Sequence, residues 1–147
     1  RQYIKGVEAC VWTEYMENPQ RVEYMAYPRA LAVAESGWSN PSGKNWENFV
    51  ERLQDHFGRL DARGVNYSKN LYNVFITITK DDIYSKVATI RTDMPGVDIY
   101  YTLDGSEPTN ASNLYTKPFV INKSEVVKAR AFLNGKPIGV TATKGWN

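Results

Sequence analysis

Trp12 and Glu14 are the two side chains in this sequence whose types and spacing most clearly suggest chemistry. They end residues 6–14, an apolar-leaning run that reads Gly-Val-Glu-Ala-Cys-Val-Trp-Thr-Glu. In a strand, residues two apart point to the same face, so the pair shares a face if the extended conformation continues past Trp12. An indole ring packs on the C–H face of a sugar, and a carboxylate accepts hydrogen bonds from its hydroxyls. By spacing alone, a core tryptophan beside a surface glutamate is the more common arrangement.

A strand over residues 3–12, followed by helices, is predicted to position this pair. Asn18 and Pro19 indicate a helix start, with asparagine as the cap and proline in the first turn. Pro28 interrupts this helix, and a second helical segment runs on until Gly37. A third helix, capped by Asn45, has apolar residues at helical spacing, namely Trp46, Phe49, Val50, Leu53, Phe57 and Leu60.

The second half of the chain changes from helical spacing to an alternation of two. Strands are predicted over residues 74–79, 87–92, 97–103, 119–121 and 126–133. Asn134 and Gly135 give the strongest hairpin signal, because both positions of such a turn require positive φ. Short strands separated by turn residues predict an antiparallel β-sandwich.

Residues 6–14 resemble the last barrel strand of glycoside hydrolase family 20, the β-N-acetylhexosaminidases. Members carry a Gly-x-Glu-Ala-x-x-Trp-x-Glu run there, and many have glycine where this chain has Val7 and Thr13. The resemblance continues through Tyr24, Pro28, Arg29, Ala32, Ala34, Glu35, Trp38, Phe49, Arg52, Leu53 and Leu60. Arg29 and Glu35 are expected to serve as ion-pair or capping groups of the helices. The resemblance implies that Trp12 and Glu14 line the pocket for the non-reducing-end sugar.

The second half resembles the chitobiase/hexosaminidase C-terminal domain, a small immunoglobulin- or fibronectin-like sandwich. The resemblance rests on residues 100–109, 114–115, 118–119 and 128–131. Together the two resemblances imply an α+β fragment. Residues 1–66 would be the last strand and helices of a (β/α)8 barrel, and residues 67–147 an antiparallel β-sandwich.

No catalytic residue is assigned within this chain. In family 20 the substrate's acetamido oxygen attacks the anomeric carbon, and an adjacent Asp-Glu pair on an earlier barrel strand supplies orientation and general acid/base catalysis. Asp81 and Asp82 do not resemble that pair, and a solvated turn is the favoured interpretation. Asp104 and Glu107 also fit a turn better than a metal loop, because calcium prefers six to eight oxygens. No metal or cofactor is expected.

Composition narrows the classes of partner. A net charge of +2, from 18 basic and 16 acidic residues without a basic block, gives no electrostatic case for nucleic acid. No apolar run approaches the length of a membrane span. Cys10 is the single cysteine, so no intrachain disulfide forms, and it is expected to be a small buried apolar side chain.

The resulting hypothesis is the C-terminal part of a β-N-acetylhexosaminidase that acts on N-acetylhexosamine-terminated glycans, with a periplasmic or secreted parent. The chain alone is expected to be inactive. It is also expected to bind the rest of the parent barrel and, in isolation, to dimerise or pack its helices on the sandwich. The alternative is a carbohydrate-binding or scaffold module that uses Tyr100, Tyr101 and Tyr115. Tyr100 and Tyr101 point to opposite sides of a strand, which weakens that alternative.

Overall fold

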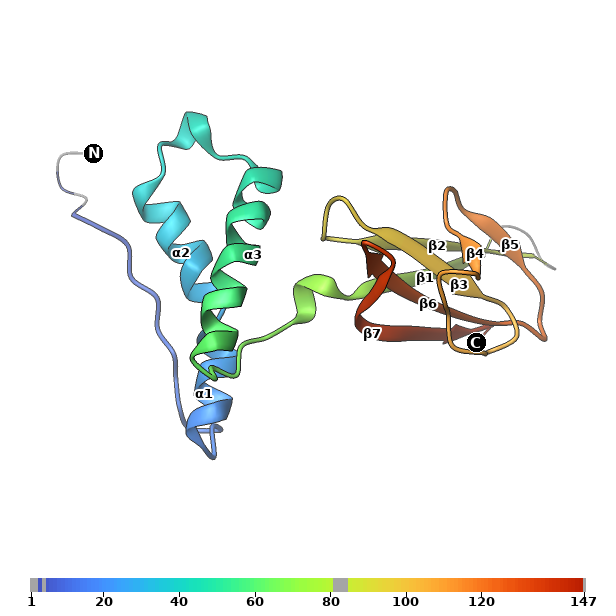
Figure 1. The fold of residues 1–147 in the computed structure, drawn as a ribbon, viewed down its shortest axis with the longest axis horizontal. Helices are drawn as coiled ribbons and strands as arrows, with labels where there is room; N and C mark the ends of the chain where they lie inside the picture. Colours follow the sequence, from blue (N-terminus) through green and yellow to red (C-terminus); the bar gives the residue numbers. More distant parts are fainter. Residues whose placement is uncertain (1–2, 4, 81–84, 147) are drawn as a thin grey trace. The chain divides into compact units, whose positions relative to one another are not determined.

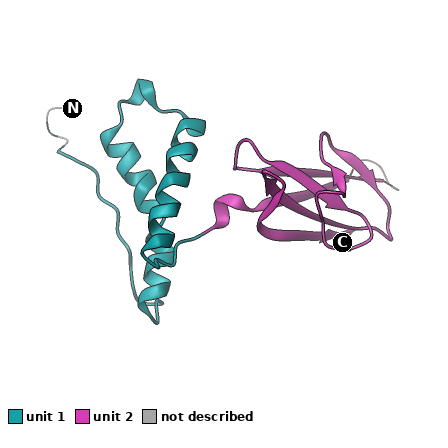
Figure 2. Ribbon diagram, in the orientation of Figure 1, with its two compact units in different colours: residues 1–68 teal, residues 69–147 magenta. Residues whose placement is uncertain are grey.

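The chain divides into two compact units. The computed structural model describes residues 3, 5–80 and 85–146. The first unit comprises residues 1–68 and the second residues 69–147 (Figures 1 and 2). The boundary lies two residues from the one expected from the sequence. Asp81 and Asp82, for which a turn was predicted, lie outside the described residues.

The first unit contains the helices that the sequence predicted. They are α1 (Pro19–Ala26), α2 (Arg29–Trp38) and α3 (Trp46–Ala62), with a short 3-10 turn at Pro41–Gly43. The Asn18 side chain accepts a hydrogen bond from the Arg21 backbone N–H at 2.9 Å, which satisfies one free donor of the first turn of α1. Pro28 separates α1 from α2, as its missing N–H and its ring require.

Helix α3 supplies the core of the first unit. Val50, Leu53 and Phe57 lie at helical spacing and are all buried. The chain after α3 folds back, so that the Tyr67 ring stacks on Phe57 with centroids 4.5 Å apart. The Ser68 backbone N–H then donates to the Tyr27 carbonyl at 3.0 Å, which ties the end of the unit to the α1–α2 junction.

Residues 5–13 do not form the predicted strand. They are neither helical nor sheet-paired, and Figure 1 shows them as a drawn-out segment. A strand needs a neighbour for its backbone N–H and C=O groups, and the described residues of this unit offer no sheet. Cys10 lies on this segment and is exposed, so the prediction that it is buried was wrong.

The second unit is an antiparallel β-sandwich. One sheet has the order β1-β2-β5, from Val74–Lys80, Lys86–Thr92 and Phe119–Ile121. The other has the order β4-β3-β6-β7, from Asn113–Leu114, Asp98–Thr102, Val126–Leu133 and Lys136–Gly145. A short 3-10 turn, Asn70–Tyr72, precedes β1. The sequence predicted no strand at the two-residue β4, because two residues carry no periodicity, and it implied β7 only through the hairpin at Asn134 and Gly135.

Both sheets contribute side chains to one core. Val74 and Ile121 from the first sheet and Val127 and Ala129 from the second are all nearly or fully inaccessible to solvent. The predicted hairpin between β6 and β7 is confirmed, with φ of 51° at Asn134 and 74° at Gly135. Alternation along the strands therefore sets which side chains enter the core.

Candidate functional site

The structure places Trp12 and Glu14 in different local conformations. Trp12 lies in the drawn-out segment and is 73% exposed. The Met16 backbone N–H donates to the Thr13 carbonyl at 3.0 Å, which closes a turn with Glu14 as one of its two central residues. The extended conformation therefore ends near Thr13, and a turn rather than a strand places the Glu14 carboxylate. Both side chains are open to solvent, and each is free to meet a ligand.

A bidentate ion pair between Glu35 and Arg52 joins α2 to α3. Arg52 Nη1 and Nη2 donate to Glu35 Oε2 and Oε1 at 2.9 and 2.8 Å, and Arg52 Nε donates to Asn48 Oδ1 at 2.9 Å. The Glu35 side chain is only 16% exposed. The Arg52 guanidinium lowers the pKa of Glu35 below its ordinary 4.5, chiefly by hydrogen bonding to the carboxylate. The expected structural role of Glu35 is confirmed.

Arg29 caps the C-terminal end of α1. Its Nη1 donates to the Tyr24 and Met25 carbonyls at 3.1 and 3.0 Å. These carbonyls belong to the last turn of α1, where backbone acceptors lack partners within the helix. The expectation that Arg29 is a capping group is confirmed.

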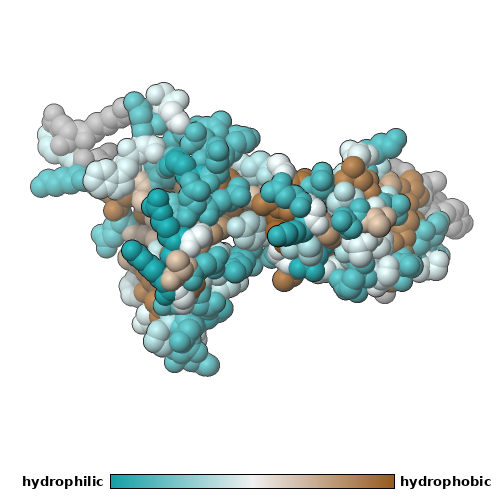
Figure 3. All heavy atoms as spheres, viewed as in Figure 1, coloured by the Kyte–Doolittle hydropathy of each residue, from teal (hydrophilic) through white to brown (hydrophobic). Residues whose placement is uncertain are grey.

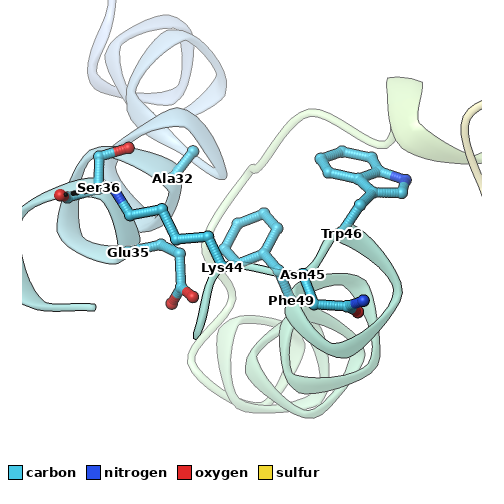
Figure 4. A pocket seen from close by; sticks show the side chains of 7 residues that line it. All are labelled: Ala32, Glu35, Ser36, Lys44, Asn45, Trp46 and Phe49. Atoms are coloured by element: carbon cyan, nitrogen blue, oxygen red, sulfur yellow. Dashed lines mark hydrogen bonds between the residues drawn. The ribbon is translucent and has the colours of Figure 1, made fainter. Parts of the chain in front are cut away.

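An open hollow of about 260 Å³ lies between α2 and α3 (Figure 4). Its lining consists of Ala32, Glu35, Ser36, Lys44, Asn45, Trp46 and Phe49. Lys44 Nζ crosses it to donate to the Ser36 carbonyl at 3.0 Å, as the dashed line in Figure 4 shows. Because Glu35 is engaged by Arg52 and Lys44 by a backbone carbonyl, the hollow presents mainly the Trp46 and Phe49 rings. Trp12 and Glu14 are not among its lining residues.

The sandwich does not gather its tyrosines on one surface. The Tyr101 ring stacks on Phe119 with centroids 4.4 Å apart, and Tyr115 meets both rings edge-on; all three rings are partly buried and pack against the core. Tyr100, one residue earlier, packs edge-on against Phe132, with centroids 5.1 Å apart. The three tyrosines therefore form no shared flat platform for a polysaccharide.

The two carboxylates of the loop after β3, Asp104 and Glu107, accept hydrogen bonds from other residues of the sandwich. Asp104 Oδ1 accepts from the Ser106 backbone N–H at 3.0 Å and from its hydroxyl at 2.6 Å, and these bonds lower the pKa of Asp104. Glu107 accepts from Lys128 Nζ at 2.6 Å and from the Thr141 hydroxyl at 2.7 Å. This geometry supports the turn interpretation. Over the described residues, no cluster of three or more histidine, cysteine or acidic side chains is arranged to hold a metal ion.

Two family models match this chain. Residues 1–41 match the model described as glycosyl hydrolase family 20, catalytic domain, a stretch that includes Trp12, Glu14, α1 and α2. The N-terminal part of the chain belongs to glycosyl hydrolase family 20. Residues 88–145 match the model described as Fn3 associated, which takes in most of the sandwich.

Curated relatives of this chain carry hexosaminidase or chitobiase names. A beta-hexosaminidase of Porphyromonas gingivalis is 35% identical over 140 residues, covering 91% of this chain and 17% of that protein. A beta-hexosaminidase of Akkermansia muciniphila is 48% identical over 54 residues, which are 37% of this chain and 11% of the relative. An N,N'-diacetylchitobiase of Vibrio harveyi is 23% identical over 120 residues, covering 68% of this chain and 13% of the relative. The chain thus spans less than a fifth of the length of each of these relatives. In the part of the chain that the structure describes, no helix is long and apolar enough to cross a membrane.

Proposed function

We propose that this chain is the C-terminal part of a longer β-N-acetylhexosaminidase, which releases terminal N-acetylglucosamine or N-acetylgalactosamine from glycans or chitin-derived oligosaccharides. The observation that carries the proposal is the family 20 match over residues 1–41, the stretch that holds Trp12 and Glu14. The 35% identity to a protein named beta-hexosaminidase across nearly the whole chain supports it.

The proposed reaction retains the configuration of the sugar through participation of the substrate itself. The acetamido oxygen attacks the anomeric carbon while the glycosidic oxygen leaves with a proton from a general acid. Water, deprotonated by the same group, then attacks the anomeric carbon, and the acetamido group is released. The acid and the residue that orients the acetamido group belong to the parent outside this chain, so the chain alone is inactive.

Trp12 and Glu14 have the binding role in this proposal. The Trp12 ring, 73% exposed, offers a flat apolar face for the C–H groups of the sugar. The Glu14 carboxylate accepts from sugar hydroxyls, and a charged acceptor makes such bonds stronger than a neutral one. In the full-length protein, where neighbouring strands are available to pair with them, residues 5–13 are proposed to form the last strand of the barrel, and strand ends are where barrel enzymes place their sites.

The remainder of the parent barrel is the proposed partner of the first unit. Large apolar or aromatic side chains remain exposed there, including Tyr15 at 93% and Trp38 at 92%. On the face shown in Figure 3, hydrophobic residues also reach the surface of both units. A stable protein covers patches of this kind, by domain packing or, for the isolated chain, by pairing with a second copy.

A carbohydrate-binding sandwich is the less favoured alternative. Tyr101 and Tyr115 pack against Phe119, and Tyr100 packs against Phe132. These contacts favour a bracing role for the sandwich over a stacking platform.

The test is hydrolysis of a nitrophenyl N-acetyl-β-glucosaminide by the full-length protein, comparing wild type with Glu14→Gln. Removing the charge at a hydroxyl-binding carboxylate costs about 1.5–3 kcal/mol, so kcat/KM is expected to fall roughly 10–150-fold. Glu51→Gln, an exposed carboxylate on α3, serves as the control and leaves kcat/KM unchanged.

Three outcomes would each contradict part of the proposal. An active wild type with an unaffected Glu14→Gln variant removes Glu14 from the sugar site. An inactive full-length protein removes the hexosaminidase assignment. Turnover by purified residues 1–147 would show that the acid/base machinery lies within this chain after all.

A further inference from the structure

Gly37, near the end of α2, faces a side chain of the drawn-out segment. A Cβ added at Gly37 would lie 2.5 Å from Val7 Cγ2, and 3.6 Å from Val7 Cβ and Cγ1. Carbon atoms in contact prefer separations of about 3.5–4.0 Å, so any side chain at position 37 would displace Val7 by roughly 1 Å. The bare backbone at Gly37 is therefore a notch that the Val7 side chain occupies.

The helix itself does not require glycine at this position. Gly37 lies inside α2, and its φ is not among the positive values found at Gly64, Gly96 and other turn glycines. Glycine is a poor helix former because its backbone loses more freedom on ordering than that of other residues. The close approach of Val7 is the feature of the structure that glycine serves here.

The notch fixes which face of the segment is turned toward the helices. In an extended chain successive side chains alternate, so Val7 and Val11 share a face and Trp12 lies on the opposite one. The exposures agree, with Val7 at 56% and Val11 at 45% against 73% for Trp12. A slip of one residue would reverse the faces and turn Trp12 toward α2.

We propose that Gly37 is a positioning residue for the sugar site. By seating Val7, it sets the face and lateral position of the segment that carries Trp12 and leads into the Glu14 turn. The indole ring is thereby directed away from the helices, toward the side where the substrate would bind. This inference rests on the proposed function of Trp12 and Glu14.

The test uses the full-length protein and the nitrophenyl N-acetyl-β-glucosaminide assay. Gly37→Ala is expected to lower kcat/KM by roughly 10–100-fold, because a displacement near 1 Å of a binding group has effects of that order. The rescue variant is Val7→Ala with Gly37→Ala, which removes Cγ2 and leaves Val7 Cβ, at 3.6 Å, as the nearest atom of that residue. Its kcat/KM is expected to return to within a few fold of the Val7→Ala single variant.

Gly58→Ala is the matched control. Gly58 also lies inside a helix, and a Cβ there meets nothing within 4 Å. Both substitutions replace a helical glycine with a better helix former, but only the one at Gly37 creates a collision. Gly58→Ala is expected to keep wild-type kcat and KM.

A double-mutant cycle with Glu14→Gln separates positioning from loss of folded protein. If Gly37→Ala only reduces the fraction of protein that is folded and active, kcat falls and KM stays unchanged. Glu14→Gln then lowers kcat/KM by the same factor in the Gly37→Ala background as in wild type. If Gly37→Ala instead displaces the sugar site, KM rises. Glu14→Gln then lowers kcat/KM by a smaller factor in the Gly37→Ala background than in wild type, since the two changes act on one site.

Each remaining outcome overturns the inference. If the wild type is active and Gly37→Ala behaves like Gly58→Ala, the inference fails while the proposed function stands. A loss that Val7→Ala does not rescue, or one with unchanged KM and an undiminished effect of Glu14→Gln, reduces Gly37 to a stability role. An inactive wild type overturns the proposed function, and this inference with it.

Discussion

The Glu35 carboxylate joins two helices of the first unit, α2 and α3, through its contact with the Arg52 side chain. Its two oxygens accept hydrogen bonds from the two Arg52 Nη groups, and this planar bidentate geometry makes the contact one of the stronger forms of ion pair. Arg52 is half exposed, so solvent screens part of the attraction, whereas the Glu35 side chain is mostly covered. The pair therefore orients α2 against α3 more than it stabilises the protein as a whole.

Stability of the helical unit should depend on pH through Glu35. Because folding lowers the pKa of Glu35 below its ordinary 4.5, this group stabilises the fold above that value. The contribution is lost as the pH falls through the lowered, folded-state pKa. Glu35→Gln should therefore reduce the urea midpoint at neutral pH, and the difference from wild type should disappear in acid.

Circular dichroism of the helices across a pH series measures this effect. Glu51→Gln, on the exposed face of α3, controls for the loss of one negative charge. A Glu35→Gln difference that persists unchanged into acid would show that the ion pair is not its origin.

At the scale of elements, α3 depends on its cap as well as on its apolar face. Asn45 Oδ1 accepts from the Asn48 backbone N–H at 2.8 Å, and Glu47 adds a negative charge to the first turn. The buried face of Val50, Leu53 and Phe57 then packs the helix into the unit. Cap and face agree, which is why the sequence located this helix well.

Asn45→Ala should destabilise the helical unit by about 1 kcal/mol, the typical cost of losing such a cap. Asn45→Asp keeps an acceptor oxygen and should stay close to wild type. Urea unfolding followed by circular dichroism compares the two variants. Equal stability of Asn45→Ala and Asn45→Asp would mean that the cap contributes little here.

At the scale of the whole molecule, the two units differ in how completely each buries its own apolar residues. The sandwich has a core built from both sheets, with Ala88, Ile121 and Val127 at 1% exposure or less. The first unit buries one face of α3 but leaves Trp12, Tyr15 and Trp38 open. Residues 69–147 should therefore be able to fold independently of the first unit.

Residues 69–147 produced alone should fold cooperatively and remain monomeric. Residues 1–147 should associate as their concentration rises, because the first unit adds the most exposed aromatic side chains, Tyr15 at 93% and Trp38 at 92%. Sedimentation velocity of both chains distinguishes the two behaviours. Association of the sandwich alone, or a monomeric full chain at high concentration, would contradict the expectation that the first unit drives pairing.

Features that depend on residues close together in the chain could be predicted from the sequence. The α1 start at Asn18, the break at Pro28 and the hairpin at Asn134 follow from caps, from a missing N–H and from positive φ. The family 20 resemblance was likewise visible in residues 6–14 and is shown by the match over residues 1–41.

Tertiary structure alone decided features that join distant residues. No local sequence pattern predicts that Val7 packs against Gly37, or that Tyr101 stacks on Phe119 against the core of the sandwich. Residues 5–12, in the described part of the strand predicted over residues 3–12, are unpaired for the same reason, because a strand exists only when another strand satisfies its backbone. Local signals fix where elements begin and end, whereas pairing and side-chain contact depend on which surfaces meet.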